Sequence, residues 1–343
     1  LIPGTFARYE PFFGVNRTKA TAGCGIIAAT IPVMAVMLIV HGRLVYPIYG
    51  MRVDTPEAAA LVVMIFYGGL HAIYLLLAAT SWAQGRGNAT AGVDWNKPFP
   101  PHKIIGNVYF VGSEQLGSFL ITTPAGHILI NSDYEETVPV IQAAVEKLGF
   151  KFTDIKILLG SHAHPDHMTG DALVKQLTGA TVMAMEEDVP ALTNMRPGGK
   201  PHPIDRVLHD GDTVTLGGTT LVAHLTPGHT KGCTTWALKT TENGKTYDVV
   251  IVGSVSLNAA NLAGTPAYPN IQEDFIRSFR KLRSLPADVF LGSHTGFYRM
   301  TEKYARLEKG EPNPFLDPSG YKALIDSAEK AFQTRVEELK GTR

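Results

Sequence analysis

The chain has 343 residues, which is enough for one large domain with additions or for two domains. Its 31 Lys and Arg residues balance its 31 Asp and Glu residues, so it has no net positive charge to hold a polyanion, and we expect no nucleic-acid partner. The two cysteines, Cys24 and Cys233, fall in segments of different character, so no disulfide framework is expected.

The first part of the chain is markedly apolar. Residues 20–40 and 58–79 are two apolar runs, each about long enough to cross a bilayer. We expect residues 1–50 to be an apolar N-terminal extension that lies outside the native product. The alternative is a membrane anchor of two spans, in which the apolar runs stay uncleaved and attach the protein to a membrane.

A cleavage signal follows the second apolar run. Ser81 and Ala83 are small residues that resemble a signal-peptidase site. Residues 51–83 are therefore predicted to be a signal peptide, and the mature protein is predicted to be periplasmic or secreted. Residues 84–101 contain several Gly and Pro residues and are predicted to be a flexible lead-in to a domain that spans residues 102–343.

From residue 104 onward, short apolar runs alternate with turn residues, which is typical of strands and helices packed in layers. In the first half the predicted strands are 108–111, 118–122, 127–130, 155–159 and 181–185, with a hairpin turn at 124–126, and the predicted helices are 135–148 and 171–177. The first of these helices places Val138, Ile141 and Val145 on one face and ends before Gly149.

Four side chains that bind metals lie within six residues, directly after the predicted strand 155–159. The segment His162-Ala-His-Pro-Asp-His167 contains three His residues and one Asp, although only 12 of the 343 residues are His. Imidazole nitrogen and carboxylate oxygen are the ligand atoms that Zn²⁺ prefers where thiolates are absent. Core packing gives no reason to gather polar rings at a strand end, so the segment predicts a metal site.

The second half of the chain continues the alternation of strands and helices. Its predicted strands are 213–216, 220–225, 233–238, 248–252 and 289–291, and its predicted helices are 271–282 and a docked C-terminal helix through residues 321–339. Strands interleaved with helices in two similar halves predict an α/β fold with two central sheets and helices on both outer sides, in layers α-β-β-α.

Two further His residues follow strands of the second half. His229 follows the strand 220–225, and His294 follows the strand 289–291. With the earlier segment they make six ligands, too many for one four-coordinate ion that keeps an open position. They divide into two sets of three, namely His162, His164 and His229 for one zinc ion and Asp166, His167 and His294 for a second. Two ions roughly 3.5–4 Å apart can share a bridging hydroxide.

These motifs resemble those of the metallo-β-lactamase superfamily. The pattern His-x-His-x-Asp-His, a later Pro-Gly-His-Thr and a final Gly-Ser-His carry the resemblance, which covers residues 104–315. The segments that begin at Ser161, Thr226 and Gly292 are most similar to those of subclass B3 metallo-β-lactamases. The resemblance implies a four-layer αβ/βα sandwich with two central mixed sheets, a site of two Zn²⁺ ions per chain, and the same two ligand sets. We expect a monomer.

Two serines distinguish among members of the superfamily. Glyoxalase II, lactonases and related phosphodiesterases place a metal-bridging Asp after the strand that corresponds to residues 248–252. This chain has no acidic residue there and instead resembles subclass B3 in carrying Ser254 and Ser256. The resemblance implies that Ser254 orders water near the second zinc ion and that Ser256 contacts the substrate carboxylate. The alternative is that each is an ordinary turn hydroxyl bonded to the backbone.

The remaining chemistry-bearing residues have simpler interpretations. Many subclass B3 enzymes carry a disulfide in the C-terminal part, whereas Cys233 is the only Cys after residue 24 and is expected to be a small buried hydrophobic residue. The other His residues lack ligand spacing and are expected to be structural or at the surface: His41, His71, His102, His127, His202, His209 and His224.

The sequence therefore predicts an enzyme, a metallo-β-lactamase that uses a metal-bound hydroxide to hydrolyse the amide bond of a small-molecule β-lactam and so confers antibiotic resistance. Asp166 is the predicted catalytic residue, because it would position the second zinc ion and the nucleophile. The alternative is another dizinc hydrolase of the same superfamily that acts on a lactone or thioester. A third hypothesis is a non-catalytic metal-binding or membrane-associated protein in which the site is only structural, but closed structural zinc sites are usually rich in thiolates.

Overall fold

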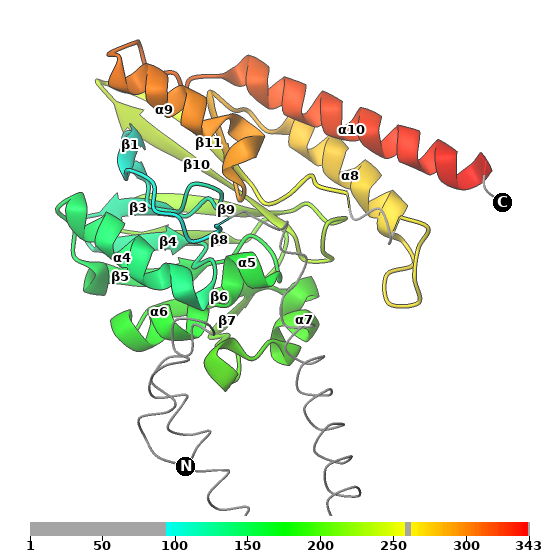
Figure 1. Cartoon of the computed structure of the whole chain (residues 1–343), viewed down its shortest axis with the longest axis horizontal. Helices are drawn as coiled ribbons and strands as arrows, with labels where there is room; N and C mark the ends of the chain where they lie inside the picture. Colours follow the sequence, from blue (N-terminus) through cyan, green and yellow to red (C-terminus); the bar gives the residue numbers. More distant parts are fainter. Residues whose placement is uncertain (1–93, 258–261, 342–343) are drawn as a thin grey trace, which may run out of the picture. The chain divides into compact units, whose positions relative to one another are not determined.

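The structure is a computed structural model, and it describes residues 94–257 and 262–341 (Figure 1). The predicted extension at residues 1–50 and the predicted signal peptide at residues 51–83 lie outside the described residues. Within the described part of the chain, no helix combines the length and the apolar character that a membrane span requires.

Two mixed β-sheets form the centre of the domain. The first sheet has seven strands in the order β1 (His102–Ile105), β2 (Val108–Phe110), β3 (Phe119–Thr123), β4 (Gly126–Ile130), β5 (Ile155–Leu159), β6 (Thr181–Met185) and β7 (Arg206–Leu208). The strands from β1 to β4 pair antiparallel, and those from β4 to β7 pair parallel. The predicted hairpin turn joins β3 to β4, where Thr123 pairs with Gly126.

The second sheet has five strands in the order β12 (Val289–Gly292), β11 (Lys245–Val252), β10 (Thr234–Glu242), β9 (Thr219–Leu225) and β8 (Thr213–Leu216). Only β11 and β12 pair parallel, and the other neighbours are antiparallel. Both sheets are therefore mixed.

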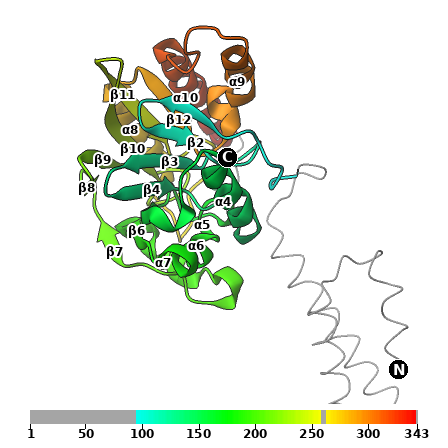
Figure 2. The same ribbon diagram turned by 90° about the vertical axis from the view of Figure 1, so that its left-hand side faces the viewer.

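Helices cover both outer sides of the paired sheets (Figures 1 and 2). The α-helices are α4 (Val138–Lys147), α5 (Pro165–Met168), α6 (Asp171–Thr178), α7 (Val189–Asn194), α8 (Ile271–Ser284), α9 (Met300–Glu308) and α10 (Pro318–Gly341). Short 3₁₀ turns are η3 (Glu135–Thr137), η4 (Phe152–Asp154), η5 (Glu186–Asp188), η6 (Pro197–Gly199) and η7 (Thr295–Tyr298). The predicted four-layer α/β sandwich is confirmed.

Alternation along the strands builds two separate hydrophobic layers. Leu120 on β3 faces α4 and packs in one cluster with Ile141 and Val145 of that helix. Its neighbour Ile121 faces the opposite way and packs in the interior between the sheets, in the same cluster as Trp236 of β10. Successive strand residues point to opposite faces, so one apolar run supplies both layers.

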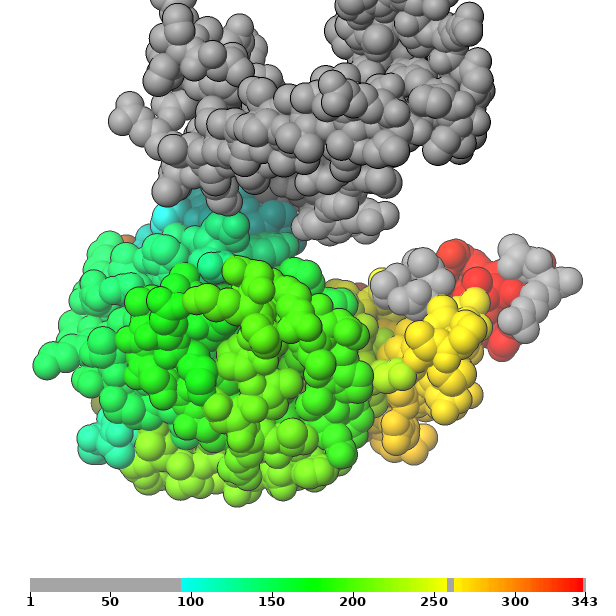
Figure 3. All heavy atoms as spheres, turned by 90° about the horizontal axis from the view of Figure 1, so that it is seen from below, coloured from blue at the N-terminus to red at the C-terminus, as the bar shows by residue number. Residues whose placement is uncertain are grey.

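The helices α8 and α10 form the outer layer on the second sheet and lie side by side (Figure 3). Phe275 and Phe279 of α8 stack at 5.9 Å, and Phe332 of α10 lies 5.5 Å and 5.8 Å from them, measured between ring centroids. Arg283 of α8 forms ion pairs with Asp326 and Glu329 of α10. The predicted C-terminal helix is thus found as α10, docked by an aromatic cluster.

The residues just before the predicted domain contact it. Residues 94–101, which the sequence assigns to a flexible lead-in, lie against the domain. The ring of Phe99 lies 5.1 Å from that of Tyr304, and the amide of Glu114 donates a hydrogen bond to the carbonyl oxygen of Lys97. The Gly and Pro composition suggested a segment whose conformational entropy keeps it flexible. The packing of the Phe99 ring on other rings offsets the loss of that entropy.

Candidate metal centre

Three strand ends supply the six predicted ligands. His162 and His164 follow β5, His229 follows β9, and His294 follows β12. Pro165 is the first residue of the short helix α5, which starts directly after His164, a residue with extended backbone (φ −114°, ψ 151°). Proline is favoured at the first turn of a helix because its fixed φ suits the position and the missing N–H is not needed there. The motif therefore changes from loop to helix at its centre, and the last ligands, Asp166 and His167, lie on α5.

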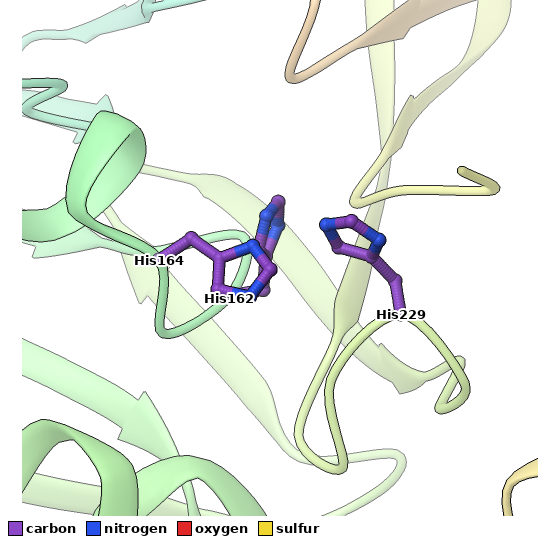
Figure 4. Close-up of side chains that lie close together, drawn as sticks. All are labelled: His162, His164 and His229. Carbon is purple, nitrogen blue, oxygen red and sulfur yellow. The ribbon is translucent and has the colours of Figure 1, made fainter. Parts of the chain in front are cut away.

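The first cluster consists of His162, His164 and His229, whose rings point toward one another from two facing loops (Figure 4). The ring centroids lie 4.6–4.8 Å apart, and the ring planes are close to perpendicular. Each ring offers one nitrogen, and these atoms all lie within 4.8 Å of one another. Three nitrogen atoms that converge in this way can hold one metal ion and leave a fourth position open.

The second cluster consists of Asp166, His167 and His294. The Oδ2 atom of Asp166 lies 3.3 Å from Nε2 of His167 and 3.6 Å from Nε2 of His294, and the two Nε2 atoms lie 3.3 Å apart. The ring centroids of His162 and His167 are only 4.3 Å apart, so the two clusters adjoin. The structure thus brings all six predicted residues together in the two predicted sets of three.

Burial keeps His162, His167 and His229 neutral. It lowers the pKa of His162 and His167 well below the usual 6.5, and neighbouring imidazoles lower both further. Burial likewise lowers the pKa of His229 to about 4. A neutral imidazole keeps a lone pair, which is the form that a metal ion binds. These three imidazoles are therefore in the protonation state that metal binding needs at neutral pH.

Hydrogen bonds on the far side of two rings direct the other nitrogen to the centre. The Nδ1 atom of His229 donates to the carbonyl oxygen of Ser256 at 2.9 Å, which leaves Nε2 free. The Nδ1 atom of His162 lies 3.2 Å from the Oγ atom of Ser161, while its Nε2 atom is buried and has no hydrogen-bond partner. Such contacts fix the tautomer and orientation of a metal-binding imidazole.

The six residues lie in a part of the chain that matches a known family. The family model of the metallo-β-lactamase superfamily matches residues 117–294, a range that contains all six residues. The chain belongs to the metallo-β-lactamase superfamily. It is therefore a member of a superfamily of metal-dependent hydrolases.

Solved structures and curated relatives of this superfamily resemble the chain to different extents. The native FEZ-1 metallo-β-lactamase of Legionella gormanii is 47% identical, with a TM-score of 0.68 over 71% of this chain and 98% of that one. BJP-1, a subclass B3 metallo-β-lactamase of Bradyrhizobium japonicum, is 35% identical, with a TM-score of 0.67 over 72% of this chain and 97% of that one. A hydroxyacylglutathione hydrolase of Cereibacter sphaeroides is 28% identical over 58% of this chain and 69% of its own length. The similarity to subclass B3 structures is confirmed.

The two serines occupy the loop after β11 in this metallo-β-lactamase fold. The backbone amide of Ser256 donates a hydrogen bond of 3.2 Å to the Oγ atom of Ser254, which is buried. The carbonyl oxygen of Ser256 is the acceptor for His229. The structure therefore shows both serines in backbone contacts beside the first cluster, and their roles toward substrate stay predictions.

A loop after β4 supports the backbone of His167, although no local sequence pattern indicates this contact. The amides of Ser132 and Asp133 both donate to the carbonyl oxygen of His167 at 3.1 Å. Asp133 has a positive φ of 57°, accepts a hydrogen bond of 2.7 Å from Ser118, and is fully buried. Burial raises the pKa of its carboxyl well above the usual range. A positive φ is uncommon outside Gly, although Asn and Asp adopt it more often than most residues, so this turn carries modest local strain.

Two aromatic residues adjoin His294. Phe297 lies 5.4 Å from the ring of His294, and Trp95 lies 5.9 Å from it, both edge-on. Phe297 is thus in contact with a predicted ligand. Trp95 lies within the predicted lead-in, where nothing in the local pattern indicated a contact with a residue almost 200 positions away.

The five other described His residues belong to neither cluster: His102, His127, His202, His209 and His224. His202 illustrates the structural role that the sequence predicts for them. Its side chain is buried, and Nε2 lies 3.1 Å both from the carbonyl oxygen of Met168 and from Oδ2 of Asp171. Cys233 is buried, as expected, and its burial raises the pKa of the thiol.

Proposed function

We propose that this protein is a zinc-dependent β-lactamase that holds two Zn²⁺ ions per chain. The proposal depends on one arrangement. Two three-residue clusters adjoin, and the neighbouring loop carries Ser254 at the position where related hydrolases are expected to have an acidic residue. The FEZ-1 and BJP-1 enzymes, both metallo-β-lactamases, support it through their similarity over almost their full lengths.

The residues of the site fit zinc. Five imidazoles and one carboxylate are a donor set typical of zinc enzymes, and no thiolate belongs to either cluster. The buried Nε2 atom of His162 has no hydrogen-bond partner among the described residues, although an unpaired buried polar atom costs roughly 1–3 kcal/mol. A metal ion bound by the first cluster would satisfy this atom. Three protein ligands per ion are typical of catalytic zinc, whereas structural zinc usually has four.

The chain's own residues would position the reactants. When bound, zinc supplies a Lewis acid and lowers the pKa of coordinated water to about 7. Asp166 adjoins both His167 and His294, so its carboxylate is placed to hold the geometry of the second set and to accept a hydrogen bond from the attacking water. Trp95 and Phe297 contact His294 and would exclude bulk water from that side.

We propose roles for the two serines, which lie on the loop whose Ser256 carbonyl oxygen contacts His229 of the first cluster. Because the carbonyl oxygen of Ser256 holds His229, the Ser256 residue lies next to the three-histidine set. We assign its hydroxyl to the substrate carboxylate. The Ser254 oxygen already accepts the Ser256 amide, so its O–H group is left to donate to a water molecule of the site.

A second candidate function is hydrolysis of a thioester or lactone. The observation that favours it is the similarity to hydroxyacylglutathione hydrolases, at 28% identity over 200 residues. Position 254 is a serine and not an acidic residue. This counts against thioester or lactone hydrolysis, since the related hydrolases are expected to have a metal-bridging Asp at this position.

A paired assay distinguishes the two functions. The full chain, loaded with zinc, is offered nitrocefin, a carbapenem, a homoserine lactone and a glutathione thioester, beside a chelated control. We expect hydrolysis of the β-lactams that disappears on chelation. Turnover of the thioester or lactone alone would replace the proposed function with the second candidate.

We also propose that the enzyme acts in the periplasm or outside the cell and confers antibiotic resistance. The apolar residues 58–79 and the small residues after them motivate this location. Expression of the full chain in a susceptible bacterium is expected to raise the inhibitory concentration of β-lactams, and mass spectrometry of the product is expected to place its N-terminus near residue 84. An uncleaved product in the membrane fraction would support the anchor instead.

A further inference from the structure

We infer that Asp188 is a positioning residue for the three-histidine cluster, because its buried carboxylate ties together the two loops that supply His162, His164 and His229. This role rests on the proposed zinc centre. Asp188 lies at the end of η5, after β6, and its side chain reaches both loops although it belongs to neither.

Three hydrogen bonds converge on the carboxylate. The amide of Ala163, the residue between His162 and His164, donates to Oδ2 at 2.8 Å. The hydroxyl of Thr230, which follows His229, donates to Oδ2 at 2.9 Å, and the amide of Gly232 donates to Oδ1 at 2.8 Å. One side chain therefore fixes the backbone on both sides of the cluster.

The Asp188 side chain makes these hydrogen bonds instead of capping the helix that follows it. Asp188 precedes the first residue of α7, a position where Asp commonly caps the helix through its side chain. Here the carboxylate makes no such cap, and only 3% of the residue is exposed. Burial raises the pKa of Asp188, and the three hydrogen bonds offset part of that effect. A buried carboxylate without its own helix cap is costly unless other donors satisfy it, as these do.

The close approach of Gly232 is a second, independent sign of this contact. A Cβ atom on Gly232 would lie 2.5 Å from the amide nitrogen of Asp188 and 2.6 Å from its Cβ atom. Only glycine allows the loop to approach so closely. The two loops and η5 thus meet at a point where a side chain at position 232 would force the backbone to move.

The chemistry of the contact requires a carboxylate. All three partners are donors, and they approach both oxygens, so the group must accept on both sides. An amide in its place would present N–H groups to at least one N–H or O–H donor. The variant Asp188→Asn, which keeps the shape, therefore separates the hydrogen-bonding role from simple packing.

The test measures the zinc affinity of the full chain by competition with a chromophoric chelator. In an Asp166→Asn background the second set is weakened, so the three-histidine set is the remaining tight site. We expect Asp188→Asn to weaken this site about 10–100-fold, the range typical when a group that orients metal ligands is lost. The matched control is Glu187→Gln, an exposed neighbour, which is expected to leave the affinity unchanged.

A second background separates positioning from general loss of structure. In a His162→Ala background, where the set containing Asp166 remains, Asp188→Asn is expected to leave the zinc affinity unchanged. If Asp188→Asn fails to fold, Thr230→Val replaces it, since it removes only one hydrogen bond and is expected to lower the affinity about 2–10-fold.

Two results would overturn the role of Asp188. One is a folded variant with unaltered affinity at the three-histidine set, and the other is an equal loss of affinity in both backgrounds. A wild-type chain that takes up no zinc would instead contradict the proposed function, so the two failures are distinguishable.

Discussion

The imidazole rings of His162 and His167 lie 4.3 Å apart, although each belongs to a different ligand cluster. Both come from one six-residue segment, in which Pro165 starts a helix between them. A single turn of the chain thus supplies neighbouring ligands to two adjoining sites.

Removal of one ligand from the first cluster tests its part in metal binding. We expect His162→Ala to lower the zinc content from two ions to one per chain and to lower kcat/KM for nitrocefin by at least about 100-fold. Metal analysis after dialysis, combined with steady-state kinetics, measures both. The matched control is His209→Ala, at an exposed position outside both clusters, and two retained ions in the His162→Ala variant would refute the assignment.

A second substitution tests the carboxylate of Asp166. Asp166→Asn keeps the size of the side chain but removes its charge, so the second zinc ion and the attacking water lose their orienting group. Misplacement of reacting groups by about 1 Å can cost about 100-fold in rate, and we expect a fall in kcat of at least this size. The control Asp154→Asn changes a half-exposed carboxylate at the opposite end of β5 from the motif. Full turnover by Asp166→Asn would show that this residue has no catalytic part.

Metal removal is expected to lower stability as well as activity. A ligand that binds only the folded state stabilises it by about 4 kcal/mol when its free concentration is about 1,000 times its dissociation constant. EDTA should therefore abolish hydrolysis and lower the midpoint of thermal unfolding, and added zinc should restore both. Scanning calorimetry with and without EDTA provides the measurement. An unchanged midpoint would mean that the clusters do not hold the metal.

The buried pair of His202 and Asp171 predicts a pH dependence of stability in the metal-free protein. Burial lowers the pKa of His202, but the hydrogen bond and charge of Asp171 outweigh it, so the pKa is raised above the usual 6.5. The interaction of protonated His202 with Asp171 therefore stabilises the folded state. This stability is fully present below about pH 6.5 and is lost as the pH rises through the higher folded-state pKa of His202.

Substitution of His202 checks this sign. The loss of unfolding free energy in His202→Asn is expected to be larger at pH 5.5 than at pH 9, measured by urea denaturation. In an Asp171→Asn background the difference between the two pH values should vanish. A loss that grows toward high pH would contradict the assignment.

Trp236 connects the core to the motif. Its side chain is 1% exposed, and its indole N–H donates to the carbonyl oxygen of Gly160, two residues before His162. We expect Trp236→Ala to lower the free energy of unfolding by about 3–5 kcal/mol, and Trp236→Phe to lower it less while still weakening zinc binding. Urea denaturation measures the first effect. Ile276→Ala, at an exposed position, is the control and is expected to stay within about 0.5 kcal/mol.

Much of the site could be predicted because its signals are local. The ligands of the six-residue segment directly follow an apolar strand, and His229 and His294 follow strands in the same way. Strand ends of one layered fold meet at common edges, so the motif alone predicts that these side chains converge. The sheets could be predicted from local signals as well, since short apolar runs bounded by turn residues mark most of their strands.

The remaining features depend on distant parts of the chain. Asp188 lies in the acidic run Glu186–Asp188, which is locally indistinguishable from a solvated surface turn, and its burial depends on Gly232. Trp95 lies in a segment rich in Gly and Pro, and only the folded domain gives it a partner. The short elements β7 and α5 hold three and four residues, too few to show a period.

The most direct test of the two-ion site is anomalous X-ray diffraction at the zinc edge from crystals of the zinc-loaded protein. We predict two peaks roughly 3.5–4 Å apart. One peak should be ligated by His162, His164 and His229, and the other by Asp166, His167 and His294. No peak at these residues, or a single ion held elsewhere, would contradict the account.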